Sequence, residues 1–116
     1  MHEDYRKFHQ ELEENLATLG RELPGPMSGF ARLHRKGVED GALSNKIKEL
    51  MALAISITVR CEGCIAYHTH ASIQAGATRA ELIETIGVAI LMGGGPATIY
   101  ATYAMQAIDQ FLPRPE

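Results

Sequence analysis

The sequence of 116 residues has no block of basic residues and no acidic tail, and its formal net charge is only −3. Basic blocks are typical of nucleic-acid-binding proteins, and long runs of like charge are typical of disordered tails. We therefore expect no nucleic-acid partner. The first residues, MHEDYRKFHQ, are charged and contain no apolar segment, so we also expect no secretory signal and a cytoplasmic location.

The sequence also lacks an apolar run suited to crossing a membrane. An uncharged stretch extends from Gly87 to Ile108, but Gly93-Gly94-Gly95-Pro96 divides it near its middle. Neither half is long enough to span a hydrocarbon core of about 30 Å as a helix. We expect a soluble protein with no membrane partner.

Charged residues are scarce in the second half of the chain. Between Ile65 and Leu112 they are Arg79, Glu81, Glu84 and Asp109. A small monomer has little interior in which to bury helices that are apolar on nearly every side. We therefore expect a homo-oligomer whose interface uses the C-terminal helices.

Residue patterns predict an all-α fold, a compact bundle of six helices in a single domain covering residues 1–116. Several local signals bound the helices: Ser44 as an N-cap, Gly76 as a C-cap, Thr78 and Glu81 as a capping box, and Pro96 in a first turn. Two prolines and a glycine predict a loop at 23–26. The expected helices cover 3–19, 27–40, 45–59, 61–75, 79–92 and 96–112.

Cysteine occurs only twice, as the pair Cys61-Glu62-Gly63-Cys64. In a cytosolic protein such a pair is more often redox-active or metal-binding than a structural crosslink. The pair lies at the predicted start of a helix, where backbone amides and the helix dipole stabilise a thiolate. His68 follows four residues after Cys64, on the same helical face, so its imidazole can accept and return a proton. These residues predict a dithiol that cycles between thiol and disulfide.

Glu49 is the fourth candidate site residue. If the chain reverses near 59–61, two antiparallel helices place Glu49 about 15 Å behind the turn and His68 about 12 Å beyond it. These similar depths allow the carboxylate to orient the imidazole, as the third member of a triad does.

The stretch from Glu49 to about Ile90 resembles the carboxymuconolactone decarboxylase and AhpD-like alkylhydroperoxidase superfamily. The resemblance is carried by Glu49, eleven intervening residues, the cysteine pair, three residues and His68, followed by Ala71, Gly76 and the helix start at Thr78. It implies an all-helical fold that assembles into trimers or hexamers. It also implies thiol peroxidase or disulfide reductase chemistry. For this chemistry we expect no cofactor and no metal.

In the alkylhydroperoxidase-like members the second cysteine attacks the peroxide and the first resolves the resulting sulfenic acid. The resemblance therefore implies a peroxidatic Cys64, a resolving Cys61, and a proton relay through His68 and Glu49. An external dithiol would restore the reduced form. One departure is Gly63, where AhpD itself carries a histidine, and it implies weaker proton delivery at the cysteine pair.

Other interpretations of the same residues remain open. The two cysteines are also compatible with inert burial or with half of a zinc site, although only His68 and His70 are near and their spacing splays them on a helix. A lyase or isomerase of the decarboxylase type would use His68 and Glu49 for acid–base chemistry without the cysteines. A third alternative is a non-catalytic oligomer whose disulfide state changes a partner interaction.

Overall fold

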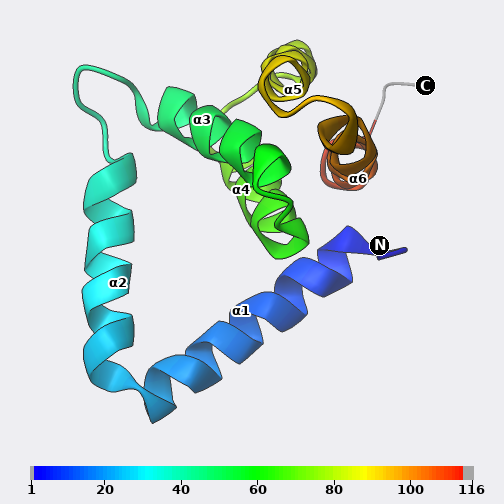
Figure 1. Ribbon diagram of the computed structural model, residues 1–116. Helices are drawn as coiled ribbons and strands as arrows, with labels where there is room; N and C mark the ends of the chain where they lie inside the picture. Colours follow the sequence, from blue (N-terminus) through cyan, green and yellow to red (C-terminus); the bar gives the residue numbers. More distant parts are fainter. Residues whose placement is uncertain (1, 114–116) are drawn as a thin grey trace.

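The computed structural model describes residues 2–113, which form six α-helices without a strand (Figure 1). This confirms the predicted all-α fold. None of these helices is both long and apolar enough to cross a membrane. The helices are α1 (Tyr5–Glu22), α2 (Pro24–Val38), α3 (Asn45–Thr58), α4 (Glu62–Gln74), α5 (Arg79–Gly93) and α6 (Gly95–Phe111).

The main hydrophobic core lies among α3, α4, α5 and α6. Its largest buried apolar side chains come from all four helices, and the short side chains of α6 let the helices pack closely. The chain reverses between α3 and α4, so these two helices pack antiparallel (Figure 1). Together they form the rigid support of the site. The fully buried members of this core include Leu53, Ile57, Ile65, Leu82, Ala104 and Ile108.

The helices α1 and α2 form a V-shaped arm beside this core (Figure 1). The N-terminal end of α1 is held in place, because Tyr5 is fully buried and Arg6 Nε donates a hydrogen bond of 2.9 Å to the Gln110 carbonyl of α6. Only Leu23 separates α1 from α2. No residue of α2 is buried, so this helix is positioned mainly by its two ends.

The loop that we predicted at 23–26 is wrong, because α2 begins at Pro24. A helix leaves its first amides without intrahelical partners, so a proline there loses no hydrogen bond. The first intrahelical bond of α2 is donated by Met27 to the Leu23 carbonyl, beyond both prolines. Two neighbouring bounds also shift: α1 continues past Gly20 to Glu22, and α2 ends at Val38.

The other local predictions are confirmed. Ser44 accepts a hydrogen bond from the Ile47 amide, and Thr78 and Glu81 form a reciprocal capping box. Gly76 has a φ of 97° after α4, in the left-handed region that glycine adopts without a Cβ clash.

Candidate functional site

The turn between α3 and α4 positions the cysteine pair at the start of α4. The Cys61 amide donates to the Ser56 carbonyl and the Arg60 amide donates to the Ile57 carbonyl, which is the hydrogen-bond pattern of a Schellman motif. Arg60 occupies the left-handed position, with a φ of 60°. Cys61 is therefore the last residue of the motif that ends α3 and also the N-cap of α4.

Cys61 and Cys64 form a disulfide, with 5.1 Å between their Cα atoms. The Cys64 amide donates to Cys61 Sγ over 3.2 Å, so a sulfur atom fills the place of the usual oxygen cap. Both cysteines are half-buried, and they lie at the N-terminal end of α4, where the first amides have no intrahelical partners. This environment favours a thiolate in the reduced form, because the helix N-terminus stabilises negative charge.

Glu49 and His68 lie in contact, as their depths along the antiparallel helices predicted. His68 Nδ1 is 2.8 Å from Glu49 Oε1. The Glu49 side chain is 6% exposed and that of His68 is 19% exposed, so the carboxylate is inside the protein and the imidazole reaches its surface. With Nδ1 occupied by Glu49, Nε2 is the imidazole nitrogen left for proton exchange.

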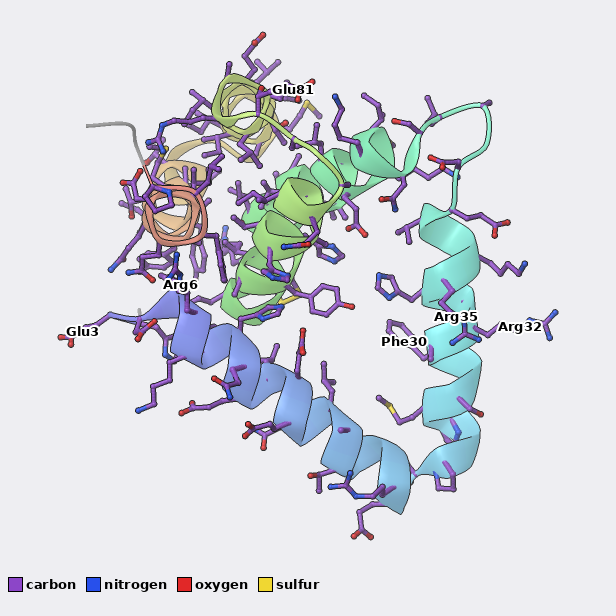
Figure 2. The ribbon with its side chains drawn as sticks, turned by 180° about the vertical axis from the view of Figure 1, so that it is seen from behind. Glu3, Arg6, Phe30, Arg32, Arg35 and Glu81 are labelled. Atoms are coloured by element: carbon purple, nitrogen blue, oxygen red, sulfur yellow. A yellow bond between two sulfur atoms is a disulfide. The ribbon has the colours of Figure 1, made fainter. Side chains whose placement is uncertain are left out.

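A cavity of about 880 Å³ opens between the arm and the start of α4. Apolar side chains from α1 and α2, among them Leu12, Leu16, Met27 and Phe30, line most of it. Its polar part contains both cysteines together with Tyr67, His68 and His34. Figure 2 shows Phe30 directed from α2 into the space that α1, α2 and α4 enclose. The disulfide therefore lies at one side of an open, mostly apolar chamber.

Tyr67 lines the polar part of the cavity. Burial raises the pKa of its phenol, and the nearby Glu49 carboxylate raises this pKa further. The group therefore stays protonated at neutral pH and can donate a hydrogen bond. His70, set aside from the sequence, indeed lies elsewhere, with its ring against His9 and Phe111.

The N-terminal segment is attached to the residue between the two cysteines. Tyr5 Oη donates a hydrogen bond of 2.8 Å to Glu62 Oε2, and the His2 amide donates to the same oxygen over 3.0 Å. Burial and the Glu62 carboxylate both raise the pKa of Tyr5, which keeps the phenol as a donor. Gly63 faces α1, and a Cβ there would lie 3.4 Å from both methyl groups of Leu12.

The structure thus brings together the four residues that the sequence predicted, Glu49, Cys61, Cys64 and His68, on one turn and two helices. Within residues 2–113 there is no group of three or more histidine, cysteine or acidic side chains suited to a metal ion. Sequence reasoning missed His34 and Tyr5. The spacing of His34 from Met27 and Phe30 places it on the same face of α2, but nothing local indicates what that face meets.

The sequence profile of the carboxymuconolactone decarboxylase family matches residues 24–107. Among curated proteins, an uncharacterised protein of Cupriavidus necator is 34% identical over 99 residues, covering 85% of this chain and 88% of its own length. An uncharacterised protein from the cox locus of Paracoccus denitrificans is 33% identical over 81 residues, or 70% and 73% of the two chains.

Two solved structures share the fold. A carboxymuconolactone decarboxylase family protein from Legionella pneumophila superimposes with a TM-score of 0.89 and 38% identity, covering 95% of this chain and 97% of that one. A family member from Thermotoga maritima has a TM-score of 0.71 and 28% identity over 83% and 88% of the chains, and its description links it, as a possibility, to an antioxidative response. The matched profile, the sequence relatives and the shared fold place this chain in the carboxymuconolactone decarboxylase family.

Proposed function

We propose that this protein is a thiol-dependent reductase that uses Cys61 and Cys64 to reduce hydroperoxides or disulfides. The observation that supports this proposal most directly is the Cys61–Cys64 disulfide at a helix start, beside the Glu49–His68 pair and open to a cavity. An antioxidant role suggested for the Thermotoga maritima relative agrees with it.

In the proposed reaction with a hydroperoxide, His68 Nε2 accepts the proton of the Cys64 thiol, and Glu49 stabilises the imidazolium. The thiolate attacks the terminal peroxide oxygen, so that an S–O bond forms and the O–O bond breaks. The alkoxide takes up a proton and leaves as an alcohol. Cys61 then attacks the sulfenic acid, releasing water and forming the disulfide, which an external dithiol reduces.

The assignment of Cys64 as the attacking sulfur has a physical basis beyond the resemblance. Cys64 and His68 are four residues apart on α4 and so share a helical face. Cys61 precedes the helix as its N-cap, seven residues from His68. We therefore assign Cys61 the resolving role and Cys64 the nucleophilic one.

The test mixes the reduced protein with a small excess of cumene hydroperoxide and counts the remaining thiols. The wild type should lose two thiols per chain and form one disulfide. Cys61→Ser should lose one thiol and accumulate a sulfenic acid that a dimedone probe labels, whereas Cys64→Ser should keep its thiol. Full retention of thiols by the wild type at high peroxide would refute peroxide reduction. The same experiment with a small organic disulfide tests the second substrate class.

If the protein were instead a lyase or isomerase of the decarboxylase type, its activity would not require the cysteines. Turnover of a small lactone or keto acid that persists in the Cys61→Ser, Cys64→Ser double variant and disappears in His68→Gln would favour that chemistry over ours.

We also propose that the protein is a homo-oligomer, with a trimer or hexamer as the expected state. Large apolar side chains on α5 and the start of α6 are exposed in the single chain: Val88 at 55%, Leu91 at 79%, Met92 at 76% and Ile99 at 56%. Such a patch is typical of a subunit interface. Sedimentation equilibrium should give a multiple of the 12.7 kDa chain mass, and Leu91→Glu should lower it. A monomer at micromolar concentration would contradict this proposal.

A further inference from the structure

The carboxylate of Glu62 lies beside the cysteine pair but does not line the cavity. Glu62 is the first residue of α4, between Cys61 and Cys64, whose Cα atoms are 5.1 Å apart. Both cysteines line the cavity, whereas the Glu62 carboxylate accepts hydrogen bonds from Tyr5 Oη and from the His2 amide. In this first helical turn the negative charge is therefore held against the N-terminal segment, and the cysteines are open to the chamber.

A carboxylate in this turn opposes the reactivity that the proposed function requires. A nearby charge of the same sign disfavours an ionised group, so the Glu62 carboxylate disfavours the Cys64 thiolate that the helix N-terminus favours. Only two helical positions separate the two residues. Donors that bind the carboxylate offset part of its charge and fix its position. The way in which Glu62 is held therefore affects how much Cys64 thiolate is present.

The Tyr5 phenol is a donor with a fixed position. Its side chain has no exposed surface and packs against Ala66 of α4 and Ala107 of α6. The Tyr5 amide also donates a hydrogen bond to Gln110 Oε1 of α6. Burial and the Glu62 carboxylate raise the pKa of the phenol, which therefore keeps its proton at neutral pH. Tyr5 thus presents a protonated hydroxyl 2.8 Å from Glu62 Oε2.

We propose that Tyr5 is a positioning residue for the cysteine pair, which holds the Glu62 carboxylate against the N-terminal segment and so preserves the Cys64 thiolate. This inference rests on the proposed function, in which Cys64 is the attacking sulfur. Tyr5 is fully buried and does not line the cavity, so it acts through Glu62. Without the phenol hydroxyl the carboxylate has one donor fewer, and its charge acts more strongly on Cys64.

The test measures the alkylation of Cys64 by iodoacetamide against pH in the Cys61→Ser background, where Cys64 is the single thiol. Tyr5→Phe should raise the pH midpoint of the profile and slow alkylation about threefold below that midpoint, because less thiolate is present. Glu62→Gln keeps an oxygen for Tyr5 but carries no charge, so it should lower the midpoint. Tyr103→Phe is the matched control, because it removes a phenol hydroxyl beside the same small core and should leave the profile unchanged.

The decisive comparison is Tyr5→Phe in the Glu62→Gln background. If Tyr5 acts through the charge of Glu62, this substitution should have no further effect on the alkylation profile. An equal shift with and without that charge would show that Tyr5 acts only through packing, and would overturn the proposal. An unchanged profile for Glu62→Gln, which alters no fully buried residue, would overturn it as well. Alkylation requires no peroxide, so these failures are distinguishable from a failure of thiol oxidation, which would overturn the proposed reaction.

Discussion

The Glu49–His68 pair predicts an asymmetry in stability that can be measured. The Glu49 carboxylate is almost completely enclosed, with 6% of its side chain exposed, whereas His68 is 19% exposed at a cavity wall. Removing the imidazole therefore leaves a buried charge without its partner, and removing the carboxylate leaves an imidazole that can be neutral and reach solvent. The two substitutions should not cost the same.

We choose replacements that keep volume, so that cavity formation does not dominate. His68→Phe should lower the free energy of unfolding by about 3–5 kcal/mol, the usual cost of an uncompensated buried charge. Glu49→Met should lower it by about 1–3 kcal/mol, the range for loss of a hydrogen bond with one polar group left behind. The double variant places two apolar side chains together and should cost only about 0–1 kcal/mol relative to wild type.

The measurement is urea unfolding followed by circular dichroism. All four proteins are kept in the disulfide form and at one concentration, because association contributes to apparent stability. The coupling between the two substitutions then follows from the double-mutant cycle. A larger loss for Glu49→Met than for His68→Phe, or additive losses, would refute the reasoning, because both outcomes require that the carboxylate is not held by the imidazole.

Three further predictions concern the disulfide, two glycines of α5 and the turn at Arg60. The disulfide closes a loop of four residues, so its reduction should lower the free energy of unfolding by about 2 kcal/mol. An unchanged urea midpoint on adding dithiothreitol would contradict this. In the Cys61→Ser, Cys64→Ser double variant, dithiothreitol should leave the midpoint unchanged. Gly93→Ala should destabilise by about 1–3 kcal/mol, because the new Cβ would lie 2.7 Å from that of Ala97. Gly87→Ala on the same helix meets nothing within 4 Å and should stabilise by about 0.5–1 kcal/mol, so equal unfolding free energies for these two variants would be inconsistent with the packing. Arg60→Gly should raise stability by about 1 kcal/mol by relieving the φ of 60°, and a lower midpoint in thermal unfolding would count against strain at this turn.

Helix ends with local signals could be predicted from the sequence. The Ser44 cap, the Thr78–Glu81 capping box and the glycine after α4 each depend on residues within a few positions of one another. The start of α2 could not be placed in this way. Pro24 and Pro26 are compatible both with a loop and with a first helical turn, and no side-chain cap at Leu23 marks the start of the helix.

The contacts of the site also differ in whether the sequence could predict them. The contact between Glu49 and His68 could be predicted because a single reversal of the chain fixes the relative depth of two helices. The approach of His34 to Tyr67 and His68 depends instead on the angle between α2 and α4, which no local pattern encodes. The left-handed conformation of Arg60 could not be predicted either, because glycine is the residue that ordinarily signals such a turn.

Because α2 has no buried residue, the reacting groups of the site and much of its wall are supported by different helices. The sulfur atoms and the proton relay are held by α3 and α4, while much of the chamber wall is contributed by a helix outside the core. The apolar side chains of the arm can consequently be exchanged without disturbing the chemistry of the cysteines, His68 and Glu49. Chimeras that carry α2 of one relative in the chain of another would then inherit the ligand preference of the donor and the reactivity of the recipient.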